Sequence, residues 1–159
     1  MNRRSFVLAL PATCAVLTLP RAFAHHGWSS FDDNRPIYLE GTVKKASWQN
    51  PHVELILETP ADLKLPADLA KRSVPAQSTS LDAAGILGKT TVPRRKDRTW
   101  EIELAPLTRM NQWKVPEIKA GEQIALVGYT FKDEQGEAIL RAEYLFRGNS
   151  VTPLRSGPV

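Results

Sequence analysis

The fold is decided by residues 37–48, which read IYLEGTVKKASW. Apolar or small residues occupy every second position from Ile37 to Val43, and this period of two predicts a strand with one buried face. The pair Lys44-Lys45 breaks the alternation and the apolar side resumes at Ala46, as a β-bulge would cause. Gly41, in the middle of the strand, fits the sharply bent strand of a small barrel.

Four later segments carry the same kind of signal. Val53, Leu55 and Leu57 alternate and are expected to form a buried face, which leaves His52 and Glu54 on the outer side. Asn50-Pro51 predicts a turn or corner before this strand. Three more strands are expected over 99–104, 123–131 and 138–147, with a hairpin turn at 132–136 and the core residue Trp100. Five strands, the first long and bent, predict an all-β fold: a small OB-like antiparallel barrel. A sandwich of five to seven strands is the alternative.

The remaining segments have loop composition. Residues 59–98 contain many of the prolines and the basic run Arg94–Arg98, so we expect a long inserted loop with a short helix around 61–71. A helical turn is expected at 106–112, and the tail 148–159 is expected to be loose. We expect one domain, residues 25–159, because 135 residues suit a domain of ordinary size.

Residues 1–24 have the pattern of a cleaved signal peptide. Arg3 and Arg4 form a basic start, an apolar stretch follows, and Ala22-Phe23-Ala24 has the small-x-small pattern of a cleavage site. The arginine pair also indicates the twin-arginine (Tat) export route and therefore a bacterial periplasmic or secreted protein. We expect no transmembrane segment after cleavage, and the one cysteine, Cys14, lies in the leader, so the mature chain has no thiol.

The three histidines of the chain suggest a metal site. Cleavage after Ala24 would make His25 the N-terminal residue, whose amine and imidazole can chelate a metal, and His26 and His52 can add nitrogens. Nitrogen-rich, thiol-free ligands suit Cu(II), so copper is the expected cofactor, provided the three histidines converge in the fold. Five further residues are candidates for orienting a ligand or lining a groove, namely Asp32, Trp28, Trp48, Asn50 and Glu54. The alternative is that the histidines are structural.

The chain resembles a family of small exported bacterial proteins of unknown function. The resemblance rests on His25-His26-Gly27-Trp28 at the expected mature start and on Trp48-Gln49-Asn50-Pro51-His52. Glu40–Val43, Trp100–Leu104 and the Gly121-Glu122 turn add to it. The segment 59–98 is longer than the family usually has there. The resemblance implies a periplasmic location and a small β-barrel, and it implies no activity.

Charge and motifs narrow the function classes. Removing the three leader arginines lowers Lys+Arg from 21 to 18 against 17 acidic residues, and a net charge of about +1 argues against nucleic-acid binding. No nucleophile–base–orienter set is recognisable, so we expect no enzymatic activity. The favoured hypothesis is a periplasmic copper-binding protein that serves a metalloprotein or oxidoreductase partner. The alternative is an interaction module whose barrel face or long loop binds a protein or small ligand.

Overall fold

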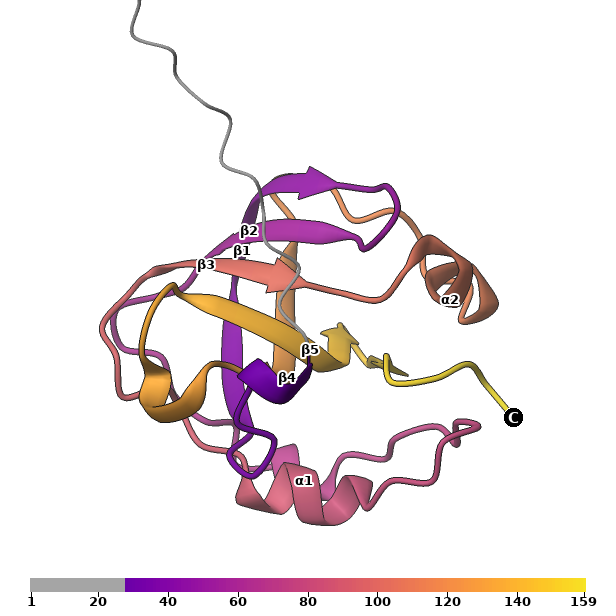
Figure 1. Cartoon of the computed structure of the whole chain (residues 1–159), viewed down its shortest axis with the longest axis horizontal. Helices are drawn as coiled ribbons and strands as arrows, with labels where there is room; N and C mark the ends of the chain where they lie inside the picture. The colour runs from indigo at the N-terminus through magenta and orange to yellow at the C-terminus, as the bar shows by residue number, and fades with distance from the viewer. Residues whose placement is uncertain (1–27) are drawn as a thin grey trace, which may run out of the picture.

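Five strands close into a barrel in the computed structural model, which describes residues 28–159 (Figure 1). A sixth, short strand extends the sheet beside β5, and two short α-helices lie at the periphery. The strands are β1 (Ile37–Ser47), β2 (Glu54–Glu58), β3 (Thr99–Glu103), β4 (Gln123–Tyr129), β5 (Ile139–Arg147) and β6 (Ser150–Pro153). The helices are α1 (Ala83–Lys89) and α2 (Leu107–Gln112), with 3₁₀ turns η1 (Trp28–Ser30), η2 (Leu69–Lys71) and η3 (Lys132–Glu134).

The strand pairing confirms the predicted small all-β barrel and excludes an open sandwich. β1 pairs with both β2 and β4, β2 pairs with β3, and β4 pairs with β5, all antiparallel. The barrel closes through a parallel pairing of β3 with β5, which joins Glu101 to Ile139 and Glu103 to Arg141. One pairing is therefore parallel in a barrel that we expected to be antiparallel throughout.

The first strand bends as its sequence predicts. Its register with β2 shifts between Val43 and Lys45, which confirms the bulge expected at Lys44-Lys45. At Gly41 the backbone of β2 comes so close that an added Cβ would lie 2.1 Å from the carbonyl oxygen of Glu58. Glycine is therefore required where β1 curves across β2.

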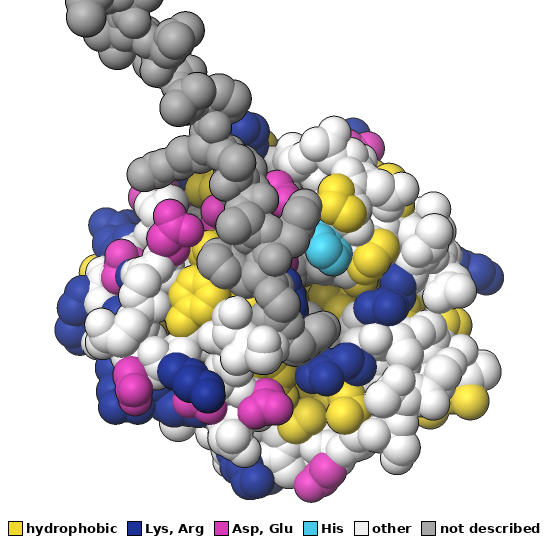
Figure 2. Space-filling view, viewed as in Figure 1, with side chains coloured by type: hydrophobic (Ala, Val, Ile, Leu, Met, Phe, Trp, Pro, Cys, Tyr) yellow, Lys and Arg dark blue, Asp and Glu magenta, His cyan; other side chains and the backbone are white. Residues whose placement is uncertain are grey.

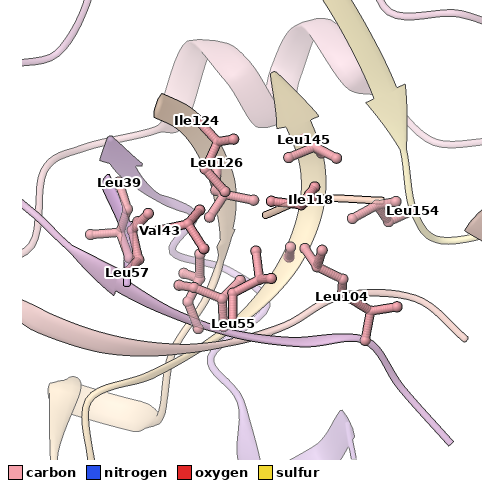
Figure 3. Close-up of a cluster of buried hydrophobic side chains, with 14 of the residues drawn as sticks. Leu39, Val43, Leu55, Leu57, Leu104, Ile118, Ile124, Leu126, Leu145 and Leu154 are labelled. Carbon is pink, nitrogen blue, oxygen red and sulfur yellow. The ribbon is translucent and has the colours of Figure 1, made fainter. Parts of the chain in front are cut away.

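The barrel interior is filled by the alternating apolar residues of the strands. Val53, Leu55 and Leu57 are buried as predicted, and Trp100 is completely buried. Figure 3 shows side chains from facing strands meeting in this core. The labelled residues are Leu39, Val43, Leu55, Leu57, Leu104, Ile118, Ile124, Leu126, Leu145 and Leu154.

The insert between β2 and β3 packs against the outside of the barrel. Leu69 of η2 and Leu87 of α1 are buried in a second apolar cluster with Tyr38, Val127 and Phe146. The expected helix over 61–71 is wrong except for the single turn η2, and the longer helix of the insert is α1. The segment therefore adds a cover over β1, β4 and β5 (Figure 1).

The C-terminal tail is not loose, which corrects the prediction from its composition. Residues Ser150–Pro153 form β6 on the edge of β5, and Leu154 is buried. Arg155 donates two hydrogen bonds to the Glu143 carboxylate, at 3.0 and 2.5 Å. A tail rich in Ser, Pro and Gly thus gains its order from tertiary contacts rather than from local propensity.

No helix within residues 28–159 is long and apolar enough to cross a bilayer. The predicted leader and the predicted cleavage site lie outside the described residues.

Candidate functional site

The corner between β1 and β2 carries the Trp48–His52 motif. Trp48 is half-buried against the barrel core, and the Asn50–Pro51 peptide bond is cis. The Asn50 side-chain oxygen accepts a hydrogen bond from the backbone N–H of Leu107, 3.3 Å away, in the first turn of α2. Trp48 and Asn50 therefore fix the corner to the core and to α2, which is a structural role for two residues predicted to line a groove.

His52 directly precedes Val53, which continues the β2–β3 pairing beyond the ends of the strands. Val53 donates its N–H to the Ala105 carbonyl oxygen at 3.2 Å, and its own carbonyl oxygen accepts from the N–H of Leu104 at 2.8 Å. Because Val53 is fully buried, its neighbours His52 and Glu54 turn to the outer side, where both are partly exposed. In Figure 2, His52 is the cyan side chain, and it is visible on the face shown.

Residues that lie opposite one another in the strand register form a row across the outer face, from the strand that follows His52 towards the N-terminal segment. Glu54 lies opposite Glu103 in the β2–β3 register. Arg141, which lies opposite Glu103 in the register that closes the barrel, donates to the Glu103 carboxylate at 2.8 and 2.6 Å. The guanidinium of Arg141 also lies 4.5 Å from the ring centroid of Phe31, within the range of a cation–π contact.

Phe31 anchors the start of the described chain on this face. Its ring stacks on Phe131 with the centroids 5.0 Å apart, and it is almost fully buried. Asp32 follows directly, donates its N–H to the Thr130 carbonyl oxygen at 2.9 Å and accepts from the N–H of Asn34 at 3.2 Å. These contacts assign Asp32 to the turn after Phe31 rather than to the His52 corner.

The outer surface of β2 and β3 is acidic and hollowed. A groove of about 360 Å³ runs over it. Burial raises the pKa of the Glu101 carboxyl, and the neighbouring carboxylates of Glu54, Glu103 and Glu137 raise it further. An added positive charge on this face would be favoured, since it would relieve repulsion among these groups. The groove is lined by Lys45, Ser47, Gln49, Pro51, Glu54, Leu55, Ile56 and Glu101.

The predicted site is only partly covered by the structure. Trp48, Asn50, His52 and Glu54 share the corner, whereas His25 and His26 lie outside the described residues, and Trp28 is described only as the first residue of η1. Within residues 28–159, no three His, Cys, Asp or Glu side chains are grouped so as to hold a metal ion. A metal centre with three or more such ligands at His52 would therefore need a donor from outside this range.

The sequence patterns did not identify two residues that form part of this face. Glu103 and Arg141 form an ion pair at 2.6 Å whose side chains are 8% and 11% exposed. Glu103 alternates with the buried Ile102 and Leu104 and so lies on the outer side, but its partner is 38 residues away across the closing pairing. Only the barrel register brings the two together.

Comparison with known proteins finds a match to a family model whose function is unknown. Residues 14–64 match the model described as a family of unknown function (DUF6152), and this stretch includes His25-His26 and the Trp48–His52 corner. The match supports the expected resemblance to a family of unknown function, and it covers less than half of the chain. No curated protein and no solved structure matches the chain.

Proposed function

We propose that this is a periplasmic, non-enzymatic copper-binding protein that holds Cu(II) between its mature N-terminus and the His52 corner. The donors are the amine and imidazole of His25, the imidazole of His26 and the imidazole of His52. Nitrogen donors of this kind favour Cu(II) over Mg²⁺ or Ca²⁺. Glu54, two residues after His52 on the same outer side, is the candidate for a further ligand or for orienting an imidazole.

The observation that carries this proposal is the position of Phe31 relative to His52. Phe31 touches Arg141, which is one strand from Glu103 and two strands from Glu54. Two strand spacings amount to about 10 Å, and the two residues from Glu54 back to His52 add about 7 Å along the strand. At right angles, these steps put His52 about 12 Å from the β5 position of Arg141.

That separation is within reach of the N-terminal histidines. His26 is five residues before Phe31. The three steps from Trp28 to Phe31 run through the 3₁₀ turn η1, at about 2.0 Å per residue, and the two steps before it cover at most about 3.5 Å each, or about 13 Å in total. His25 has one residue more. Covalent geometry therefore allows both histidines to meet His52, and it does so because Phe31 is anchored on the same outer face.

The test is a Cu(II) titration followed by EPR on protein purified from the periplasm, after mass spectrometry has fixed its N-terminus. One parallel sample carries an extra residue before His25, and a second carries His52→Ala. A matched control is Gln49→Ala, at an exposed position of the same corner. We expect nitrogen-rich binding that the extension abolishes and that His52→Ala weakens at least 10-fold, since even second-shell changes cost about 10–100-fold.

Binding that survives both the extension and His52→Ala would refute the proposed site. Binding lost on extension but unchanged by His52→Ala would leave amino-terminal ligation and remove the corner from the site. Loss in Gln49→Ala equal to that in His52→Ala would indicate damage to the corner rather than loss of a ligand.

A second candidate is an interaction module in which the histidines are structural. The acidic groove over β1, β2 and β3 favours it, because a cationic group with an apolar body would contact both the Glu54 and Glu101 carboxylates and the Ile56 side chain. This candidate requires no free amine at His25. Ligand binding that is unchanged by the N-terminal extension and weakened by Glu101→Gln would distinguish it from copper binding.

A further inference from the structure

The end of the insert forms a second hollow, on a different part of the barrel from the His52 corner. It has a volume of about 260 Å³ and lies between residues 59–63, which leave β2, and residues 92–98, which lead into β3. Figure 2 shows Lys and Arg side chains gathered at the left edge, where Figure 1 places the segment entering β3. Its apolar lining is Pro60, Ala61, Leu63, Val92, Pro93 and Trp100.

The cations of the basic run at this hollow differ in how much of their hydrogen-bonding and pairing capacity the fold already uses. Arg95 is structural, because it donates to the carbonyl oxygens of Glu134 and Glu137, each at 3.1 Å, and pairs with Asp97 at 2.7 Å. Its guanidinium also lies 5.4 Å from the ring centroid of Trp100. Arg95 therefore shapes the wall of the hollow, and its charge is balanced by Asp97.

Lys96 and Arg98 are the cations of this run with N–H groups available to bind a ligand. Lys96 is exposed and forms no ion pair with any residue in the range 28–159. Arg98 uses its Nε to bond the Thr59 carbonyl oxygen at 3.1 Å, which holds the guanidinium at the rim. Its nearest carboxylate, Glu58, is 3.7 Å away and is itself paired with Lys44 at 3.0 Å.

The charge count of this region is therefore positive. Within residues 59–63 and 92–98 the cations are Arg94, Arg95, Lys96 and Arg98, and the carboxylates are Asp62 and Asp97, which leaves an excess of two positive charges. The pKa of the Asp97 carboxyl is lowered by its hydrogen bond from Arg95, so Asp97 stays ionised and keeps that arginine occupied. The surplus falls on the side chains that face the open hollow.

We propose that this hollow binds a small organic carboxylate, with its carboxylate between Lys96 and Arg98 and its apolar body against Pro60, Leu63 and Val92. An apolar wall with a few convergent polar groups is the usual composition of a small-molecule site. The guanidinium of Arg98 is suited to a planar carboxylate, and its contact with Thr59 holds it in place before the ligand arrives. This site is independent of the copper proposal.

The test uses benzoate as the probe and benzamide, its neutral counterpart of similar shape. Calorimetric titration measures the affinity, and amide shift changes in ¹⁵N-labelled protein locate the site. The variants are Lys96→Gln and Arg98→Gln, with Lys89→Gln as the control, because it removes the same charge from an exposed position of the same insert. Thermal melts show whether Arg98→Gln has lost the Thr59 contact, and Lys96→Gln remains informative if it has.

We expect saturable 1:1 benzoate binding, no measurable benzamide binding, and shift changes at Ala61, Val92 and Asp97. Lys96→Gln should weaken benzoate about 10-fold, the factor for one lost charge-assisted contact of about 1.4 kcal/mol. Equal binding of benzamide, equal loss in Lys89→Gln, or shift changes elsewhere would overturn the proposal. Binding of a long polyanion but not of benzoate would also overturn it and would identify the run as an electrostatic docking surface.

Discussion

Replacing Glu134 with glutamine tests how the insert is held on the barrel. The Glu134 carboxylate accepts the backbone N–H of Arg94 at 3.0 and 2.9 Å and that of Arg95 at 2.8 Å. It also pairs with the Arg35 guanidinium at 2.6 Å, and its side chain is 4% exposed. One buried carboxylate thus joins the end of the insert, the β4–β5 turn and the segment that precedes β1.

The magnitude follows from what an amide can replace. The glutamine side chain of the Glu134→Gln variant would keep one oxygen acceptor, but its NH₂ group would face N–H donors, so one charge-assisted hydrogen bond and the ion pair are lost. A hydrogen bond to a charged group contributes about 1.5–3 kcal/mol, and breaking a buried pair costs about 3–5 kcal/mol. We therefore expect the free energy of unfolding to fall by about 3 kcal/mol, which lowers the Tm by roughly 10 °C.

The pKa of Glu134 sets how the stability lost in Glu134→Gln depends on pH. Burial by itself would raise the pKa of Glu134, but the N–H groups of Arg94 and Arg95 and the Arg35 guanidinium outweigh it, so the pKa is lowered. A lowered carboxyl pKa stabilises the fold fully above the unfolded value of about 4.3, and this stability is lost as the pH falls through the folded value. The difference between wild type and Glu134→Gln should therefore be largest at neutral pH and should shrink in acid.

The assay is urea unfolding of wild type, Glu134→Gln and Glu137→Gln at pH 7 and at pH 3. Glu137 is exposed in the same turn, and it contributes to Arg95 only through its backbone oxygen, so its variant should unfold like wild type. A loss below 1 kcal/mol in Glu134→Gln at pH 7, or the same loss at both pH values, would refute the reasoning.

Two further substitutions probe the strands. Gly41→Ala should lower the free energy of unfolding by about 3 kcal/mol in a urea melt, because its Cβ meets the Glu58 backbone, whereas Gly88→Ala has open space and should not; equal melts would contradict the close approach. Glu143→Gln should behave oppositely to Glu134→Gln, because burial raises the pKa of Glu143 despite Arg155. A raised carboxyl pKa adds stability that is present below the unfolded value and lost as pH rises through the folded one, so this variant should gain on wild type between pH 4 and pH 7 in the same melts; a growing deficit would contradict this sign.

The strands were predictable because each one carries its own burial pattern. Val53, Leu55 and Leu57 alternate in the sequence and are buried in the structure, and the break at Lys44-Lys45 is the bulge. A half-buried strand has a period of two whatever it pairs with, so its existence and its inner face follow from local sequence. The parallel closure of β3 on β5 does not, because register and partner depend on the whole barrel.

The insert and the tail were not predictable for a related reason. Their buried residues, such as Leu69, Leu87 and Leu154, lie in or just after elements that are too short to show a period in the sequence. Prolines and polar residues around them resemble loop composition. Their order comes from surfaces such as Tyr38 and Phe146 on the outside of the barrel, which strand alternation alone would assign to solvent.

The candidate copper site likewise combines features that follow from local sequence with contacts that depend on the whole barrel. Local alternation predicted that His52 and Glu54 face outward, and the structure agrees. The row that relates His52 to Phe31 runs through Glu103 and Arg141, and these meet only where the barrel closes. The copper proposal thus uses a global feature of the fold, because the pairing of β3 with β5 brings Arg141, which contacts Phe31, beside Glu103 and the strand that follows the His52 corner. Barrel closure is therefore the physical reason to test a histidine at the chain start together with one that follows it by 27 residues.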